Sequence, residues 1–274
     1  MKGYATHLMR LLHFVLANPS LLPPFPIDSW GAPPVIPLNS NFPYGKGIAS
    51  ALYSDVGSNF YRLCGPGIGE VGKDKAWIEH DPIGTIWPVG AGEELAEEIE
   101  WISASELATI WDLDAAMIKK QIHTAVDTRT MFFSFLPNNG VAQFLFERNK
   151  HMIPKDNDTE LMWGAKIMAD LDGSQCPHFA TWALDPGRSG PSTLIITRLR
   201  ASPSTLGKLL GATMKAARDL ALDQVEVWNL GPELKAAAKE LGGKTGVRED
   251  HLPALAWYRG GDIVWRFNEK FCWC

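Results

Sequence analysis

The first residues of the chain could bind a phosphate group. Lys2-Gly3-Tyr4-Ala5 opens a stretch in which apolar residues recur every three or four positions, which predicts a helix from about Tyr4 to Ala17. The first amides of a helix have no internal partner, and the helix dipole favours a negative charge beside them. Glycine at position 3 lets a phosphate approach those amides closely. We therefore interpret Lys2, Gly3, Tyr4 and Ala5 as candidate phosphate-binding residues.

A second group of polar residues lies in the segment LYSDVGSNFYRLCGP at 52–66, where a strand followed by a short helix is predicted. Ser58 and Asn59 fall in the first turn of this helix, where they can either cap it or bind a ligand through hydrogen bonds. Asp55 follows the strand. Its carboxylate can accept a proton from an amine or form the turn.

Several other patterns do not predict a functional site. Residues 67–72 fit Gly-x-Gly-x-x-Gly, but a dinucleotide site needs a strand before and a helix after, so we expect a turn. The four cysteines and seven histidines lack the spacing of metal ligands, and no metal site is predicted. No Gly-x-Ser-x-Gly or His-Glu-x-x-His motif occurs, which disfavours hydrolases. We expect His7 and His13 to face solvent or the proline-rich segment.

The elements that must position these residues alternate between helix and strand, which predicts an α/β fold with mixed sheets and crossover helices. Beyond the first helix, a helix is expected at 58–64, one or two helices at 103–123, and further helices at 203–217, after an N-cap at Ser202, and at 232–241. Strands are expected at 48–56, 76–79, 85–89, 163–169, 179–184, 193–199, 224–229, 255–258 and 263–267. The last two should form a hairpin turned by Gly260-Gly261.

Pro19–Pro43 is dense in proline, which lacks the amide donor, so we expect neither helix nor sheet there. This segment is either a surface insertion or a lid over a substrate cleft.

Composition narrows the class of protein. The 274 residues are 46% hydrophobic and 21% charged, which is typical of a folded soluble protein. The net charge of -5 disfavours binding to nucleic acid or to an anionic membrane. No apolar run of about 18 residues predicts a membrane span, and four cysteines are too few for a disulfide scaffold. We expect a cytoplasmic protein, with some of its 11 tryptophans lining a cleft.

The two ends of the chain share one order of elements. Each part reads long helix, strand, short helix closed by glycine, strand, strand, and only the second part has a strand before its long helix. The second part also has room for further elements upstream, roughly from Ser103 to Leu184, whereas the first part has none.

The segment at 52–66 and the start of the first helix resemble the GNAT acetyltransferases. More narrowly, KGYATHLMRLLH, WGAPP, LYSDVGSNFYRLCGP and FNEKFCW are similar to the fungal lysine acetyltransferase family. The resemblance implies acetyl-CoA as donor and a small-molecule amine, such as the ε-amino group of free lysine, as acceptor. It implies that Gly3, Tyr4 and Ala5 belong to the loop that cradles the CoA pyrophosphate. Ser58 and Asn59 either bind the amides of the pantetheine arm or cap their helix. The resemblance assigns Tyr61, four residues before Gly65, as the acid that protonates the departing thiolate.

The resemblance also implies a division into domains. Residues 1–102 correspond to the C-terminal portion of a GNAT domain with a Pro-rich insertion at 18–46, and residues 103–274 to a second GNAT-like domain. The second domain has Ala238 where the first has Tyr61 and lacks a glycine-rich phosphate loop, so we expect no CoA site in it. The strands that precede the phosphate loop in the family, and its Arg or Gln, are not in this sequence.

Two alternatives to an acetyltransferase stay open. The missing part of the donor site favours a non-catalytic, truncated GNAT remnant that acts as a binding or partner protein. The Trp-rich composition and the Pro-rich segment permit a scaffold recruited to another reaction in a fungal biosynthetic pathway. The sequence gives no oligomeric state.

Overall fold

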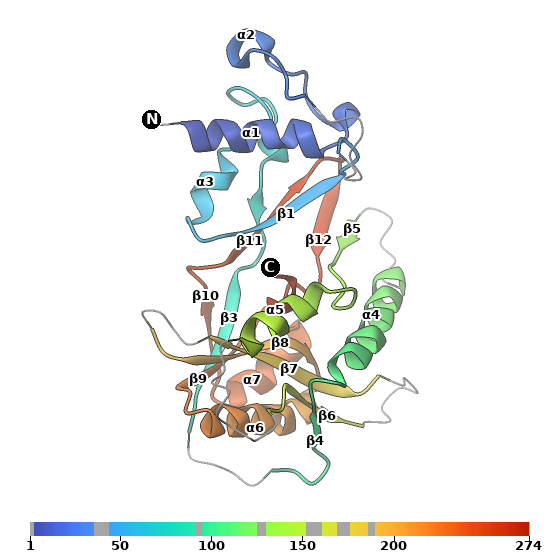
Figure 1. Ribbon diagram of the computed structural model, residues 1–274, viewed down its shortest axis with the longest axis vertical. Helices are drawn as coiled ribbons and strands as arrows, with labels where there is room; N and C mark the ends of the chain where they lie inside the picture. The colour runs from blue at the N-terminus through green and yellow to red at the C-terminus, as the bar shows by residue number, and fades with distance from the viewer. Residues whose placement is uncertain are drawn as a thin grey trace. The chain divides into compact units, whose positions relative to one another are not determined.

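The structure is a computed structural model that describes residues 3–35, 44–90, 95–124, 130–151, 161–168, 176–185 and 190–273 (Figure 1). It is a mixed α/β fold, as the sequence predicts, and its seven-stranded sheet combines parallel and antiparallel pairs. The chain separates into two compact units, each assembled from distant parts of the sequence. Unit 1 comprises Met1–Pro82, Thr128–Met131 and Arg248–Trp265, and unit 2 comprises Ile83–Asp127, Phe132–Val247 and Arg266–Cys274. The division into GNAT-like domains at residue 102 stays a prediction.

Unit 1 is built on a small antiparallel sheet that carries two helices of the candidate site. The sheet has the order β1-β11-β2, with β1 at Ala49–Ser54, β11 at Leu252–Trp257 and β2 at Ile78–Glu79. Its helices are α1 (Tyr4–Leu16), α2 (Ile27–Trp30) and α3 (Ser58–Arg62), with 3-10 turns η1 (Pro19–Leu21) and η2 (Lys73–Lys75). Apolar residues of α1, among them Met9 and Leu12, pack against a buried cluster that includes Trp77, Cys64 and Tyr258.

Unit 2 is built on a seven-stranded sheet with the order β10-β3-β9-β8-β7-β6-β4. The strands are β3 (Ile83–Pro88), β4 (Glu100–Ile102), β6 (Gly164–Ile167), β7 (His178–Asp185), β8 (Thr193–Arg200), β9 (Gln224–Trp228) and β10 (Lys244–Val247). The helices are α4 (Leu107–Thr124), α5 (Val141–Lys150), α6 (Pro203–Asp219) and α7 (Lys235–Glu240), with 3-10 turns η3 (Pro232–Leu234) and η4 (Lys270–Cys272). Among the described residues of this sheet, β8 and β9 are the one pair of neighbouring strands that runs parallel.

The parallel pair of unit 2 follows from the crossover helix between its strands. α6 connects β8 to β9, and a helical crossover returns the chain in the same direction. Ser202 caps this helix with Pro203 in its first turn, and Thr205 completes a capping box. The apolar stripe of the helix, which includes Leu206, Leu209 and Leu210, packs into the largest buried cluster of the unit. The sequence predicted this strand–helix–strand unit and its cap.

Each unit takes a strand from the other half of the sequence. β11 lies between β1 and β2 in unit 1, and β3 lies between β9 and β10 in unit 2. The two triplets therefore have the same order, β1-β11-β2 and β9-β3-β10, with their middle strands exchanged. The shared order of elements predicted from the sequence is present, but the exchange of the middle strands was not predicted.

The exchange overturns the predicted hairpin at Gly260-Gly261. β11 pairs with β1 and β2, whereas β12 (Asp262–Trp265) pairs with β5 (Thr130–Phe133) in a separate two-stranded sheet. A glycine pair between two apolar runs satisfies the local requirement for a hairpin, but the strand partners are chosen by burial against distant segments.

The proline-dense segment contains helix, contrary to prediction. η1 starts at Pro19 and α2 follows Pro26, two positions where the missing amide of proline is not needed. Within the described part of this segment, Phe25 and Trp30 pack edge-on against Phe14 of α1, with ring centroids 4.8 and 6.2 Å away. The segment thus covers one side of α1. Residues 36–43 lie outside the described residues.

Candidate functional site

The N-terminus of α1 is an open helix end. Gly3 has φ 116°, a left-handed conformation that favours glycine, and no described atom beyond its own neighbours in the chain lies within 4 Å of where its Cβ would be. Tyr4 is 76% exposed and Ala5 is also exposed. The first turn has no acidic residue, so no carboxylate of that turn competes for the amides. Lys2 lies outside the described residues.

The short helix α3 presents the second group of candidates. It starts after Gly57, whose φ of 81° again favours glycine, and Ser58 and Asn59 are exposed in its first turn. Tyr61 is half-buried, with its ring 6.1 Å from Trp77 in a T-shaped contact. The hydroxyl-bearing ring of Tyr61 therefore sits on the packed side of the helix, while Ser58 and Asn59 face solvent.

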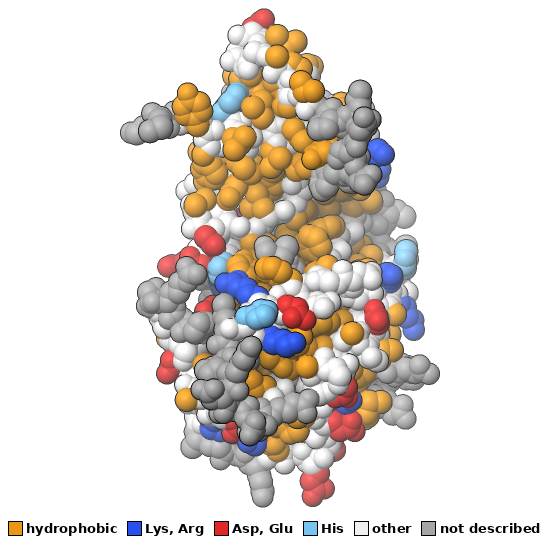
Figure 2. Space-filling model, viewed as in Figure 1, with side chains coloured by type: hydrophobic (Ala, Val, Ile, Leu, Met, Phe, Trp, Pro, Cys, Tyr) orange, Lys and Arg blue, Asp and Glu red, His pale blue; other side chains and the backbone are white. Residues whose placement is uncertain are grey.

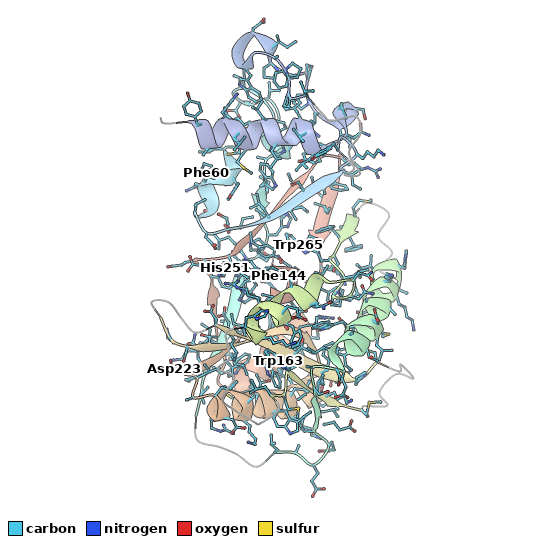
Figure 3. All side chains as sticks on the ribbon, in the orientation of Figure 1. Phe60, Phe144, Trp163, Asp223, His251 and Trp265 are labelled. Atoms are coloured by element: carbon cyan, nitrogen blue, oxygen red, sulfur yellow. The ribbon has the colours of Figure 1, made fainter. Side chains whose placement is uncertain are left out.

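The structure brings α1 and α3 side by side within unit 1. Arg10 Nη2 donates a hydrogen bond to the carbonyl of Leu63, 3.0 Å away, and His13 Nε2 lies 2.8 Å from the carbonyl of Cys64. Figure 3 shows Phe60 on α3 directly below α1. Hydrophobic side chains gather on the face of this unit seen in Figure 2. The helices that carry the two groups of candidates thus pack against each other.

A buried hydrogen-bond chain ties α1 to the exchanged strand. His13 Nδ1 lies 2.8 Å from the hydroxyl of Tyr258, which also interacts with Ser50, and Trp77 Nε1 donates to Ser50 Oγ at 3.2 Å. The carbonyl of Cys64 can only accept, so Nε2 of His13 carries the proton and Nδ1 accepts from Tyr258. Burial lowers the pKa of His13 to about 4 and raises that of Tyr258.

The expectation for the two histidines of α1 is half confirmed. His7 faces the proline-rich segment, with its ring 5.4 Å from that of Trp30. The expectation for His13 is wrong, because its side chain is fully buried. An imidazole can occupy an apolar helix face when both ring nitrogens find partners, and the partners of His13 come from positions far along the chain.

Asp55 anchors the other end of the exchanged strand. One of its carboxylate oxygens, Oδ1, accepts a hydrogen bond from the backbone amide of His251 at 2.9 Å and lies 2.7 Å from His251 Nδ1. His251 has φ 52°, a left-handed conformation, immediately before β11 (Figure 3). Of the two roles left open for Asp55, this geometry supports the structural one, although the carboxylate fixes a distant strand as well as its own turn.

Unit 2 has a buried ionic cluster that the sequence analysis missed. Arg198 Nε lies 2.6 Å from Asp114, Arg198 Nη1 pairs with Glu269, and Arg200 Nη2 lies 2.6 Å from Asp114. Burial alone would raise the pKa of Asp114, but the two arginines hold it below its ordinary value. The sequence contains an indication of this cluster in TLIITRLR, where Arg198 lies within a largely apolar strand. A buried arginine requires a buried partner of opposite charge.

The corresponding positions of unit 2 lack the candidate groups. Ala238, which stands four residues before Gly242, is buried on α7 and has no side chain that could donate a proton. α6 starts at Ser202-Pro203, where the capping box occupies the first turn. That the second domain holds no CoA site of its own stays a prediction.

The glycine-rich motif at 67–72 forms a turn, as expected. A Cβ at Gly67 would lie 2.1 Å from the carbonyl oxygen of Val71, so the motif is folded tightly on itself. Within the described ranges, no helix combines the length and apolar composition needed to cross a bilayer. Among the side chains that the structure describes, no group of three His, Cys, Asp or Glu could hold a metal ion.

Comparison with known proteins adds one family. The family model described as "LYC1 GNAT-like C-terminal domain" matches residues 86–274, from within β3 to the end of the chain. A search of curated proteins finds no match. The candidate donor-site residues at 2–5 and 58–61 precede the matched range, so their roles stay predictions.

Proposed function

The chain belongs to the LYC1 GNAT-like family, and on that premise we propose that it transfers an acetyl group from acetyl-CoA to an amine. The family implies an acyl-CoA donor. The observation that carries the proposal is the open N-terminus of α1, beside α3 with Tyr61, within one unit. Both elements are those that the resemblance assigns to donor binding and proton return.

The described residues fit the anionic end of the donor. The left-handed Gly3 leaves open space over the first amides of α1, and Tyr4 and Ala5 are exposed beside it. A pyrophosphate at this helix end would accept hydrogen bonds from those amides and would be favoured by the helix dipole. Ser58 and Asn59, exposed on α3, supply hydrogen-bonding groups for the amides of the pantetheine arm.

In the proposed reaction, the deprotonated amine attacks the carbonyl carbon of the thioester. A C–N bond forms and the C–S bond breaks, so the thiolate leaves with the electron pair. Tyr61 gives its hydroxyl proton to that sulfur, and the proton lost by the amine restores the tyrosine through solvent. Holding the two substrates in line supplies most of the rate enhancement, because it turns a bimolecular step into a unimolecular one.

We propose the ε-amino group of free lysine as the acceptor. The support for this substrate is the similarity of KGYATHLMRLLH, LYSDVGSNFYRLCGP and FNEKFCW to the fungal lysine acetyltransferases. A panel of free lysine, lysine blocked at the α-amine and lysine blocked at the ε-amine separates the two amines. Acetyl transfer should occur with the first two and should be absent with the third.

The test of the activity is acetyl-CoA-dependent release of free thiol in the presence of lysine. Tyr61→Phe should lower kcat by about 10²-fold or more, the range of a lost general acid. Tyr53→Phe, a tyrosine of the same unit on β1, is the matched control and should retain activity. Absence of thiol release with every amine, or full activity of Tyr61→Phe, would contradict the proposal.

A second candidate is a protein that binds the donor or a partner without turnover. It is favoured by the position of β1, which within the described residues is an edge strand with β11 as its one sheet neighbour. No parallel strand in the described part of unit 1 thus lies beside β1 to hold the thioester. Saturable binding of acetyl-CoA without any thiol release would support this candidate over the enzyme.

A further inference from the structure

The two parallel strands of unit 2 stop pairing before they end. The last pair between β8 and β9 joins Ile196 to Val227, yet β8 continues beside β7 to Arg200. β9 keeps its pairing with β3 up to Trp228. Ligands of open α/β sheets bind at the carboxyl ends of neighbouring parallel strands. The point where β8 and β9 part is therefore where a ligand of this unit would be expected.

A segment of the chain's own C-terminal end occupies this point. The backbone amide of Leu199, on the part of β8 unpaired with β9, donates to Glu269 Oε2 at 2.8 Å. Arg198 Nη1 pairs with the other oxygen of the same carboxylate. From the side of β9, Asn229 Nδ2 donates to the carbonyl of Asn268 at 2.5 Å. The segment thus makes hydrogen bonds to β8 and to the residue that directly follows β9.

The inserted segment, Asn268–Cys272, is buried throughout. Each of its five residues is at most 7% exposed, including Glu269 and Lys270, which are residue types seldom buried unless paired. The η4 turn within it lies against β8 and α5 near the chain end in Figure 1. Its cationic residue is sandwiched: Lys270 Nζ lies 4.2 Å from the ring centroid of Trp228 and 3.9 Å from that of Trp273.

Aromatic rings of the same segment flank the arginine that holds the carboxylate. The guanidinium carbon of Arg198 lies 5.0 Å from the ring centroid of Phe267 and 5.9 Å from that of Phe271. Its remaining nitrogens bind Asp114, at 2.6 and 3.1 Å. Asp114 and the two rings therefore fix the orientation of the guanidinium independently of Glu269. A guanidinium held in this way forms a preorganised anion site.

We propose that the place where β8 and β9 part is a carboxylate-binding site, and that Glu269 fills it as a tethered ligand. The carboxylate of Glu269 accepts hydrogen bonds from the backbone amide of Leu199 and from the guanidinium of Arg198. Backbone amides and guanidinium groups are the donors that recognise a free carboxylate or an acyl oxygen. Removal of the Glu269 side chain would leave these two donors without the carboxylate that now binds them. The occupied site explains how this unit keeps a GNAT-like sheet without taking a donor of its own.

This inference does not depend on the proposed acetyltransferase activity, since its readout is stability. In Glu269→Ala the buried arginine loses one partner, and the midpoint of thermal unfolding should fall by about 10 °C. Added sodium acetate or formate should then recover at least half of that loss, whereas sodium chloride at equal ionic strength should not. Glu240→Ala, an exposed glutamate on α7 of the same unit, should show neither the loss nor the recovery.

If Glu269→Ala does not fold in chloride, refolding in acetate gives the same comparison, and recovery only in carboxylate supports the proposal. Equal effects of acetate and chloride on this variant would overturn it. Hydrogen exchange on the unaltered protein is an independent measurement. Peptides from 267–273 should exchange as slowly as those from β8, and fast exchange of the segment would show that it is not seated as a ligand.

Discussion

His13 makes the stability of unit 1 depend on pH. Its imidazole is fully buried and neutral, held between the hydroxyl of Tyr258 and the carbonyl of Cys64. Protonation of Nδ1 would replace an accepted hydrogen bond by a buried charge that has no carboxylate among these partners. Since Tyr258 directly follows the exchanged strand β11, this protonation should loosen the link between α1 and that strand.

The size of the effect follows from the pKa of His13, which falls from 6.5 in the unfolded chain to about 4 in the folded protein. Between these two values the unfolded chain binds a proton that the folded protein does not. Stability is therefore fully present above pH 6.5 and falls as the pH drops toward 4. Between pH 7 and pH 5 the loss attributable to this group is about 2 kcal/mol.

The assay is urea unfolding at pH 7 and pH 5 for the unaltered protein and for His13→Gln. Glutamine can still donate to the carbonyl of Cys64 but does not titrate, so the variant should lose about 2 kcal/mol less than the unaltered protein on acidification. His7→Gln, on the same helix against Trp30, is the control and should keep the full pH dependence. An identical acid loss in the unaltered protein and in His13→Gln would refute the reasoning.

Three further predictions test the packing of the units. Trp87→Ala, on the exchanged strand β3, should destabilise unit 2 by about 3–5 kcal/mol and increase hydrogen exchange in β9 and β10 while β1 stays protected. Gly243→Ala should lower the unfolding midpoint, because its Cβ would lie 2.8 Å from Trp87 and 2.7 Å from the carbonyl of Ala238. Lys270→Met, which keeps length but loses the cation between two indoles, should cost about 1–2 kcal/mol in urea unfolding.

The elements of the fold were predictable because their patterns are local. The capped start of α6 at Ser202-Pro203 and the apolar run of β8 each depend on residues that are adjacent in the sequence. The choice of strand partners was not predictable in this way. The alternation within β11 fits a hairpin with β12 as well as it fits a place between β1 and β2, and only the complete sheet decides between them.

The candidate site shows the same limit. The open end of α1 at Gly3 follows from one glycine before a periodic stretch, and the structure has the left-handed conformation that this glycine permits. The burial of His13 depends on Tyr258, which is 245 residues away in the sequence, so no local pattern predicts it. Glu269 likewise occurs in a short polar run near the chain end, and its role is visible only beside Arg198.

The central claim is that the donor binds at the start of α1 in unit 1 and nowhere in unit 2. Calorimetric titration with acetyl-CoA tests it most directly on the unaltered protein and on Ala5→Glu, which adds a negative charge in the first turn and itself favours the helix. We predict one site per chain, weakened about tenfold or more by Ala5→Glu and unchanged by Glu240→Ala. Two sites per chain, no binding, or equal affinity of the unaltered protein and Ala5→Glu would contradict the account.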